Sequence, residues 1–89
     1  MDAEWDPDKA RANLKKHGVR FSDGVTALED ERALTLRDDS PEEERWVTLG
    51  VDGLGRILAV VYVWRGARVR IISVRRATPR ERRQYEGGL

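Results

Sequence analysis

Apolar and polar positions follow two different periods along this chain, and the period changes near residue 33. In the first part, helix signals dominate. Asp6-Pro7-Asp8 provides an N-cap, a proline at the first helical position and an acid in the first turn, and Gly18 follows a cationic last turn. These signals predict a short strand over 3–5 and a helix over 7–17 whose inner face carries Ala10, Asn13 and Leu14.

The rest of the pattern predicts a short helix and a series of strands. Val25 and Leu28 share one face of a second helix over 23–29, with Ser22 as its cap. From Ala33 on, short β-type runs predict strands over 34–36, 46–49, 57–64 and 69–74. An acidic loop over 38–44 and turns over 52–55 and 65–67 separate them. Thr78-Pro79-Arg80-Glu81 is a capping box that opens a C-terminal helix ending near Glu86.

This order of elements predicts an α+β fold in one domain over residues 1–89. Consecutive hairpins imply a four-stranded antiparallel meander, with the short N-terminal strand and two helices packed on it and a short C-terminal helix after it. The run 57–64 is apolar on both faces, and we expect it to be a central strand covered by the N-terminal helices on one side.

Composition narrows the chemistry. The chain has no cysteine and one histidine, which argues against disulfides, a thiol nucleophile and a transition-metal site. It lacks a glycine-rich phosphate loop, so we expect neither a metal nor another cofactor. No apolar run resembles a signal peptide or a membrane span, and we expect a cytoplasmic protein without membrane contact.

The charge is unevenly distributed although the net charge is only +1. Residues 22–55 hold ten acidic and three basic residues, whereas residues 56–85 hold nine arginines and one acid, Glu81. A surface polarised in this way suits a polyanion on its basic side. The alternative is a solvated exterior in which the arginines form salt bridges with the acidic middle segment.

The run 68–76 is the strongest candidate for function, because its arginines alternate with bulky aliphatic residues. On a regular strand, Arg68, Arg70 and Arg76 share a face, and Ser73 and Arg75 lie on the opposite one. Arginine binds phosphate through two parallel hydrogen bonds and keeps its charge when partly desolvated. Edge-strand or salt-bridge roles explain the same residues equally well.

A second candidate is Lys16-His17, at the end of the first predicted helix. Histidine transfers protons near neutral pH, and a helix end next to a loop exposes such a group. Cations at a helix C-terminus also stabilise the helix dipole without any further role.

Together these residues resemble the BrnT toxins of bacterial type II toxin–antitoxin systems. The matching positions span nearly the whole chain in the family's order: Trp5-Asp6, Lys9, Asn13, Lys16-His17-Gly18-Val19, Phe21, Asp30, Glu44-Arg45, Gly50, Arg70-Ile71-Ile72-Ser73, Arg75-Arg76-Ala77, Glu81 and Tyr85. The resemblance implies a RelE-like ribonuclease fold, an RNA substrate and growth inhibition through loss of translation. It also implies neutralisation by a BrnA-like antitoxin of the ribbon-helix-helix class, in a hetero-oligomer that contacts operator DNA only through the antitoxin.

Metal-free RNA cleavage uses the 2′-hydroxyl as nucleophile, which assigns roles to the candidate residues. We expect catalysis from Lys16, His17, Arg65, Arg70 and Arg75, RNA or phosphate binding by Arg68, Ser73 and Arg76, and antitoxin binding by Tyr85 and Arg82. On a regular strand Arg70 and Arg75 cannot both face the substrate, and Arg75 is then the better candidate. Tyr85 is equally suited to packing its own helix. The competing function is a non-catalytic module whose cationic face docks an antitoxin or another DNA-binding partner.

Overall fold

The helices and strands follow the order that the sequence predicts. The computed structural model describes residues 1–38 and 42–87, so part of the expected 38–44 loop lies outside the described residues. The elements are β1 (Ala3–Glu4), α1 (Pro7–His17), α2 (Phe21–Leu28), β2 (Leu34–Asp38), β3 (Arg45–Val51), β4 (Ile57–Arg65), β5 (Arg68–Arg76) and α3 (Pro79–Gly87). The fold is therefore α+β, with α2 starting two residues earlier than predicted.

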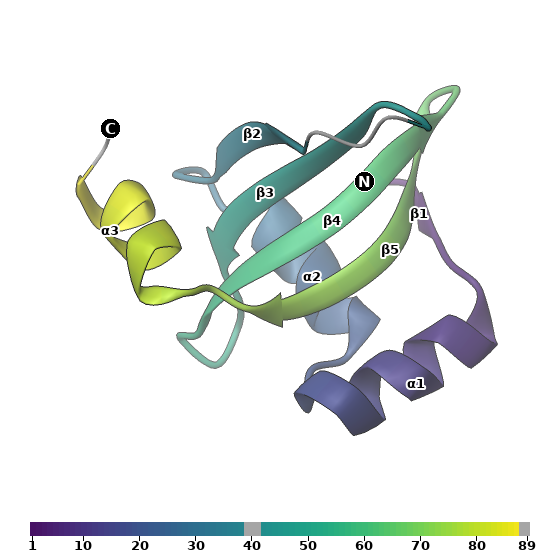
Figure 1. Ribbon diagram of the computed structural model, residues 1–89, viewed down its shortest axis with the longest axis horizontal. Coiled ribbons are helices and arrows are strands. Elements are labelled where there is room, and N and C mark those ends of the chain that lie inside the picture. Colours follow the sequence, from purple (N-terminus) through teal and green to yellow (C-terminus); the bar gives the residue numbers. More distant parts are fainter. Residues whose placement is uncertain (39–41, 88–89) are drawn as a thin grey trace.

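The strands form one sheet of five, in the order β1-β5-β4-β3-β2, instead of the four-stranded sheet that the sequence suggests (Figure 1). The four later strands are antiparallel neighbours, as predicted. The fifth is β1, which pairs in parallel with β5 through Ala3↔Val69 and Glu4↔Arg70. A parallel pair joins residues far apart in sequence, and no turn signal marks it.

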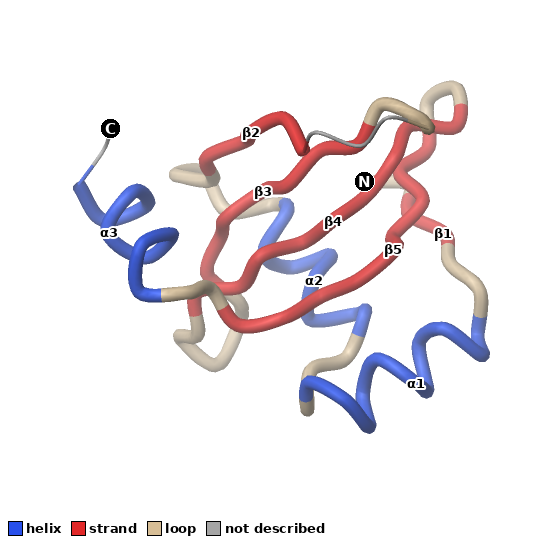
Figure 2. Tube along the Cα trace, in the orientation of Figure 1, coloured by secondary structure: helices blue, strands red, loops and turns tan. Residues whose placement is uncertain are grey.

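The helices cover only one face of the sheet, which we call the helix face. α2 crosses behind β3, β4 and β5, and α1 lies along the β5 edge (Figures 1 and 2). The core between them holds Val19, Phe21, Ala27, Leu58, Val60, Tyr62, Val69, Ile71 and Val74. α3 stands at the end of the sheet away from β1 (Figure 1). The opposite surface of the sheet, the open face, carries neither α1 nor α2.

The caps explain where the helices begin and end. The Asp6 carboxylate accepts a hydrogen bond from the Asp8 amide at 2.8 Å, and Gly18 ends α1 with a φ of 70°. α2 begins at Phe21 because the Asp23 carboxylate accepts from the Arg20 amide, so Ser22 is not the cap. Within residues 1–38 and 42–87, no helix has the length and hydrophobicity that a membrane span requires.

Candidate functional site

Most of the candidate residues on β4 and β5 share the open face. Residues paired across neighbouring strands point to the same side of a sheet, and alternate residues of one strand do so as well. The partners of the β5 candidates are all alternate residues of β4, as the pairs Ala59↔Arg75, Val61↔Ser73, Val63↔Arg70 and Arg65↔Arg68 show. The open face therefore brings together Arg65, Arg68, Arg70, Ser73 and Arg75.

A β-bulge at Ile72 produces this arrangement. The pairing passes from Val61↔Ser73 to Tyr62↔Ile71, so β5 contains one residue more than β4 at this point. The expectation of a regularly alternating strand, which separated Arg70 from Arg75, is therefore wrong. The extra residue turns Ser73 and Arg75 to the side of Arg68 and Arg70.

Arg76 is not part of this group. It pairs with Leu58, whose side chain belongs to the helix-face core, so Arg76 projects to the other side of the sheet. There it lines a cavity of about 320 Å³ together with Arg56 and Arg82. Arg75 thus projects from the open face, and the adjacent Arg76 projects from the helix face.

Each of the four arginines that β4 and β5 place on the open face already pairs with a carboxylate. Arg70 Nη1 lies 2.8 Å and Arg68 Nη1 3.8 Å from the Glu4 carboxylate on β1. Arg65 lies 3.4 Å from Glu43. Arg75 forms two bonds with Glu81 on α3, at 2.7 and 3.0 Å. Among residues 1–38 and 42–87, Glu43 is the only one of these partners from the acidic middle segment. The salt-bridge alternative therefore holds mostly through carboxylates outside that segment, which the charge pattern does not indicate.

The Arg75–Glu81 pair is the most strongly held of these contacts. Hydrogen bonds from Arg75 lower the pKa of the Glu81 carboxyl, and the bond to Glu81 raises the pKa of Arg75. Glu81 also closes the predicted capping box, since it accepts from the Thr78 amide at 2.8 Å. The same carboxylate therefore starts α3 and fixes the guanidinium of Arg75.

Tyr85 attaches the far end of α3 to the rest of the molecule. Its half-buried hydroxyl donates to the Asp30 carboxylate, which also accepts from the Val51 and Arg32 amides at 3.0 Å. Burial raises the pKa of Asp30, but these hydrogen bonds outweigh burial and lower it. Tyr85 thus has an intramolecular role in the free chain. Arg82 on the same helix is exposed, and antitoxin binding by either residue stays a prediction.

α1 places Lys16 and His17 beside the second half of β5. Asn13, one turn earlier on the helix, donates from Nδ2 to the Val74 carbonyl and accepts at Oδ1 from the Val74 amide. His17 follows at i+4 and therefore lies on the same side of α1. Its side chain is partly buried, and Lys16 is exposed.

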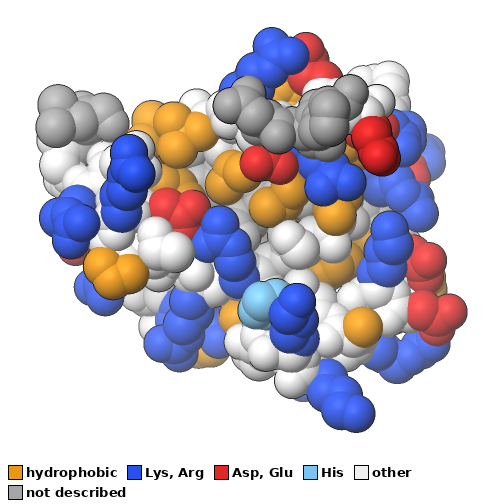
Figure 3. Space-filling model, in the orientation of Figure 1, with side chains coloured by type: hydrophobic (Ala, Val, Ile, Leu, Met, Phe, Trp, Pro, Cys, Tyr) orange, Lys and Arg blue, Asp and Glu red, His pale blue; other side chains and the backbone are white. Residues whose placement is uncertain are grey.

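The centre of the open face is apolar. Leu36, Val47 and Val61 form one cross-strand row that ends at Ser73, and all three aliphatic side chains are half-buried. Figure 3 shows this face with apolar side chains gathered over the sheet and Lys and Arg side chains around them. A surface of this kind combines an apolar floor with a cationic margin.

Sequence reasoning missed three residues that shape the site. Glu4 and Glu81 hold open-face arginines, and the sequence indicated Glu81 as a helix cap and as a position of the family resemblance, without a role beside an arginine. Arg45 lies on the open face as the cross-strand partner of Asp38. Glu44-Arg45 in the family resemblance was the available signal for Arg45, whereas no local pattern marks Glu4.

Comparisons with known proteins identify the family and a solved structure with a similar fold. Residues 5–81 match the family model described as the ribonuclease toxin BrnT of type II toxin–antitoxin systems. A search of curated proteins finds no significant match. The 1.1 Å crystal structure of the Brucella abortus ribonuclease toxin BrnT is 26% identical, with a TM-score of 0.66 over 88% of this chain and 97% of that one. Because the family model spans most of the sequence, the chain belongs to the BrnT family of ribonuclease toxins of type II toxin–antitoxin systems.

Proposed function

We propose that this chain is a RelE-like, metal-independent endoribonuclease that binds and cleaves RNA on its open face. The observation that carries the proposal is the convergence of Arg65, Arg68, Arg70 and Arg75 with Ser73 on one side of the sheet. Guanidinium groups bind phosphate oxygens in pairs, and the half-buried apolar centre offers a surface for the sugar and base. Arg76 projects from the helix face, so we do not assign it to the RNA-binding surface.

Cleavage proceeds by attack of the RNA 2′-oxygen on the adjacent phosphorus. The P–O5′ bond breaks, a base takes the 2′-hydroxyl proton, and an acid protonates the leaving O5′, so the products carry a 2′,3′-cyclic phosphate and a 5′-hydroxyl. Negative charge gathers on the phosphorane oxygens, and preorganised donors stabilise it. Arg75 is suited to this task because Glu81 already holds its guanidinium in a fixed orientation.

The remaining residues take roles according to their position. His17, with Lys16, moves the protons, because α1 ends beside the Arg75 end of β5. Ala59 and Val63, the partners of Arg75 and Arg70, are four residues apart on β4, or about 13 Å. Arg70, with Arg65 and Arg68, therefore holds the flanking phosphodiester chain, and Arg75 acts at the scissile phosphate.

As a type II toxin, the chain would inhibit growth in the cytoplasm by degrading the RNA that translation requires. A BrnA-like ribbon-helix-helix antitoxin would neutralise it by covering the open face or the exposed side of α3, including Arg82. Operator DNA would be bound only through the antitoxin in the resulting hetero-oligomer.

Single alanine substitutions test the assignment. We expect Arg75→Ala and His17→Ala to lower the rate of RNA cleavage by about a hundred-fold or more. Arg65→Ala and Arg70→Ala should weaken RNA binding instead. Arg76→Ala is the matched control, since it removes the neighbouring guanidinium from the opposite face. If the alanine variants of His17, Arg65, Arg70 and Arg75 all cleave RNA within about twofold of the wild type, the assignment is wrong.

A non-catalytic docking module is the second candidate, and the row of Leu36, Val47 and Val61 favours it, because apolar side chains of this kind suit a protein partner. The two functions separate in the purified chain. A docking module would bind its antitoxin tightly and leave RNA intact, whereas the proposed enzyme degrades RNA in the absence of the antitoxin.

A further inference from the structure

One cross-strand row of the open face has an arginine on each side of an apolar residue. Arg70 pairs with Val63 on β4 and with Glu4 on β1. On β3, Arg45 is one step beyond the Trp46↔Tyr62 pair, which places it beside Val63 on the other side. Arg45 and Arg70 are thus two strand spacings apart, or about 10 Å between backbones, and both project from the open face.

Arg45 differs from the other arginines of this face in its hydrogen bonding. Its Nε is buried and has no hydrogen-bond partner among residues 1–38 and 42–87. Buried polar groups in native proteins are nearly always satisfied, and an exception is often explained by a ligand, a water or an ion. The carboxylates of the row are at its ends, with Asp38 opposite Arg45 on β2 and Glu4 beside Arg70 on β1. Arg45 therefore offers a donor that no acceptor in the described part of the chain uses.

Arg45 and Arg70 flank Val63 on the open face, and Val63 is only 2% exposed, so its side chain is already covered by its neighbours. A phosphate held between the two guanidinium groups would lie above this covered apolar residue, where charge-assisted hydrogen bonds are strong. Two guanidinium groups on either side can each donate to one phosphate, as their planar arrangement of donors favours. This position lies about 13 Å along β4 from Ala59, the cross-strand partner of Arg75, so the two phosphate positions are offset along the sheet.

We propose that Arg45 and Arg70 form a second phosphate subsite over Val63, which takes a phosphodiester that flanks the cleaved bond. The subsite rests on the proposed RNA function and extends it, because it gives the bound strand a path across β5, β4 and β3. Arg45 is a binding residue here. Its contribution belongs to RNA affinity and KM, and the chemical step at Arg75 proceeds without it.

The test uses an RNA oligonucleotide that is 2′-deoxy at the cleaved position, so that binding is measured without cleavage. We expect Arg45→Ala to raise the Kd at least fivefold, and to raise KM for cleavable RNA by a similar factor with kcat within threefold of the wild type. Arg45→Lys keeps the positive charge but lacks the paired planar N–H donors of a guanidinium group, and it should recover only part of the affinity. Because Nε is unsatisfied, the thermal unfolding midpoint of Arg45→Ala should equal or exceed that of the wild type.

Arg37→Ala is the matched control. Arg37 lies on β2 next to this row, but its guanidinium packs over the Trp46 ring at 5.9 Å, on the helix face. Its removal should leave the Kd within twofold. The double variant of Arg45 and Arg70 should lose less than the product of the single effects, since both residues contact one phosphate.

The outcomes separate the subsite from the proposed function. Wild-type cleavage with an Arg45→Ala Kd equal to that of Arg37→Ala would overturn the subsite and leave the ribonuclease proposal standing. A wild-type chain that binds RNA through Arg45 without cleaving it would support the subsite and overturn the enzymatic proposal. A chain that does not bind the oligonucleotide at all contradicts the subsite as well.

Discussion

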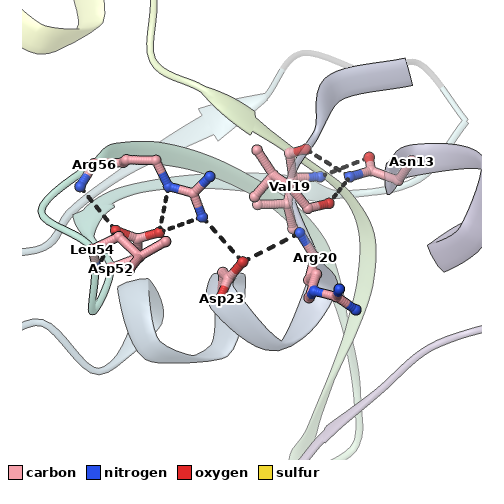
Figure 4. Close-up of polar contacts among 8 residues, drawn as sticks. Asn13, Val19, Arg20, Asp23, Asp52, Leu54 and Arg56 are labelled. Atoms are coloured by element: carbon pink, nitrogen blue, oxygen red, sulfur yellow. Dashed lines mark hydrogen bonds and ion pairs between the residues drawn. The ribbon is translucent and has the colours of Figure 1, made fainter. Parts of the chain in front are cut away.

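Asn13 takes the place of a missing strand at the edge of the sheet. β1 pairs with Val69 and Arg70 in the first half of β5, and beyond them the Asn13 amide donates to the Val74 carbonyl at 2.8 Å and accepts from the Val74 amide at 3.1 Å. Asn13 Nδ2 also donates to the Val19 carbonyl at 3.0 Å (Figure 4). A carboxamide carries both a donor and an acceptor, as a peptide group does, so one side chain satisfies a buried strand edge and holds α1 against it.

Replacing Asn13 with alanine should therefore be costly. The substitution leaves the amide and carbonyl of Val74 without partners in a buried place, and we expect a loss of about 2–4 kcal/mol in the free energy of unfolding. Urea denaturation measures this loss. Lys15→Ala, an exposed substitution in the same helix, should change it by less than about 0.5 kcal/mol. A loss for Asn13→Ala as small as that of the control would contradict the role given to Asn13.

At the scale of residues, the sequence predicts which face of a helix is buried better than it predicts what a residue on that face contacts. The inner face was predicted to carry Ala10, Asn13 and Leu14. Asn13 is 7% exposed, but Leu14 is 37% exposed and borders a surface pocket. The helical period identifies α1, yet the partner of Asn13 is 61 residues further along the chain. No spacing within the helix contains that information.

At the scale of whole elements, the sequence predicted those elements that short-range signals mark. Caps and turn residues gave α1, α3 and the hairpins, because those features depend on neighbours in sequence. The bulge at Ile72 and the pairing of β1 with β5 depend on distant strands, and the alternation of residues does not reveal them. This limit matters for function, since the bulge determines that Arg70 and Arg75 share a face.

The contact between α2 and β3 depends on the absence of a side chain at Gly50. A Cβ atom there would meet the carbonyl group of Ala27, with the carbonyl carbon at 2.9 Å. Because backbone atoms of a packed helix cannot move aside cheaply, we expect Gly50→Ala to lower stability by about 3 kcal/mol. The thermal midpoint should fall by roughly 12 °C or more for a domain of this size. Gly53→Ala, with no atom within 4 Å of its Cβ, should stay close to the wild type.

The docking of α3 should depend on pH through Glu81. Hydrogen bonds from Arg75 lower the pKa of Glu81 in the folded chain below its ordinary value of 4.5. The stabilisation is thus complete above the unfolded-state pKa and is lost as the pH falls through the folded-state pKa. At pH 7, Glu81→Gln should cost about 1 kcal/mol in the free energy of unfolding, and this difference should shrink towards zero near pH 3.

Urea unfolding of both proteins at the two pH values measures this difference. Asp30 and Asp52 also have lowered pKa values and titrate in the same range, but they are present in both proteins and cancel. Glu86→Gln removes another carboxylate from α3 and should show no difference at either pH. A Glu81→Gln penalty that is as large in acid as at neutral pH would mean that the charge of Glu81 is not what holds α3.

For the molecule as a whole, the charge pattern indicated a cationic surface but not how it is balanced. The arginine-rich C-terminal third does supply β4 and β5 with the arginines of the open face. Their carboxylate partners come from β1, the segment before β3, and α3, which the fold brings together. Net charge along the chain cannot predict such pairs. Glu4 and Glu43 are far in sequence from their arginines, and Glu81, although only six residues from Arg75, is the single acid of the arginine-rich segment 56–85. The free chain therefore presents guanidinium groups that are already partly neutralised.

This balance has a consequence for the salt dependence of RNA binding. Each contact between a cationic side chain and a phosphate of single-stranded RNA contributes about −0.7 to the slope of log K against log salt, so the five open-face arginines, if all were free, would give about −3.5. Where a phosphate displaces a carboxylate from an arginine, the freed carboxylate binds a cation, and this uptake offsets part of the cation release from the RNA. We therefore expect a wild-type slope shallower than about −3.5, measured with the non-cleavable oligonucleotide over a series of salt concentrations.

Removing one carboxylate then reveals the effect. Glu4 contacts both Arg68 and Arg70, so Glu4→Gln should bind RNA more tightly than the wild type at low salt and with a steeper slope. Glu31→Gln changes the net charge by the same amount at an exposed position where no ion pair forms within residues 1–38 and 42–87. If the two variants show equal slopes, the gain comes from overall charge, and displacement of Glu4 by phosphate is not part of binding. A steeper slope for Glu4→Gln alone means that the RNA competes with the protein's own carboxylates for the open-face arginines.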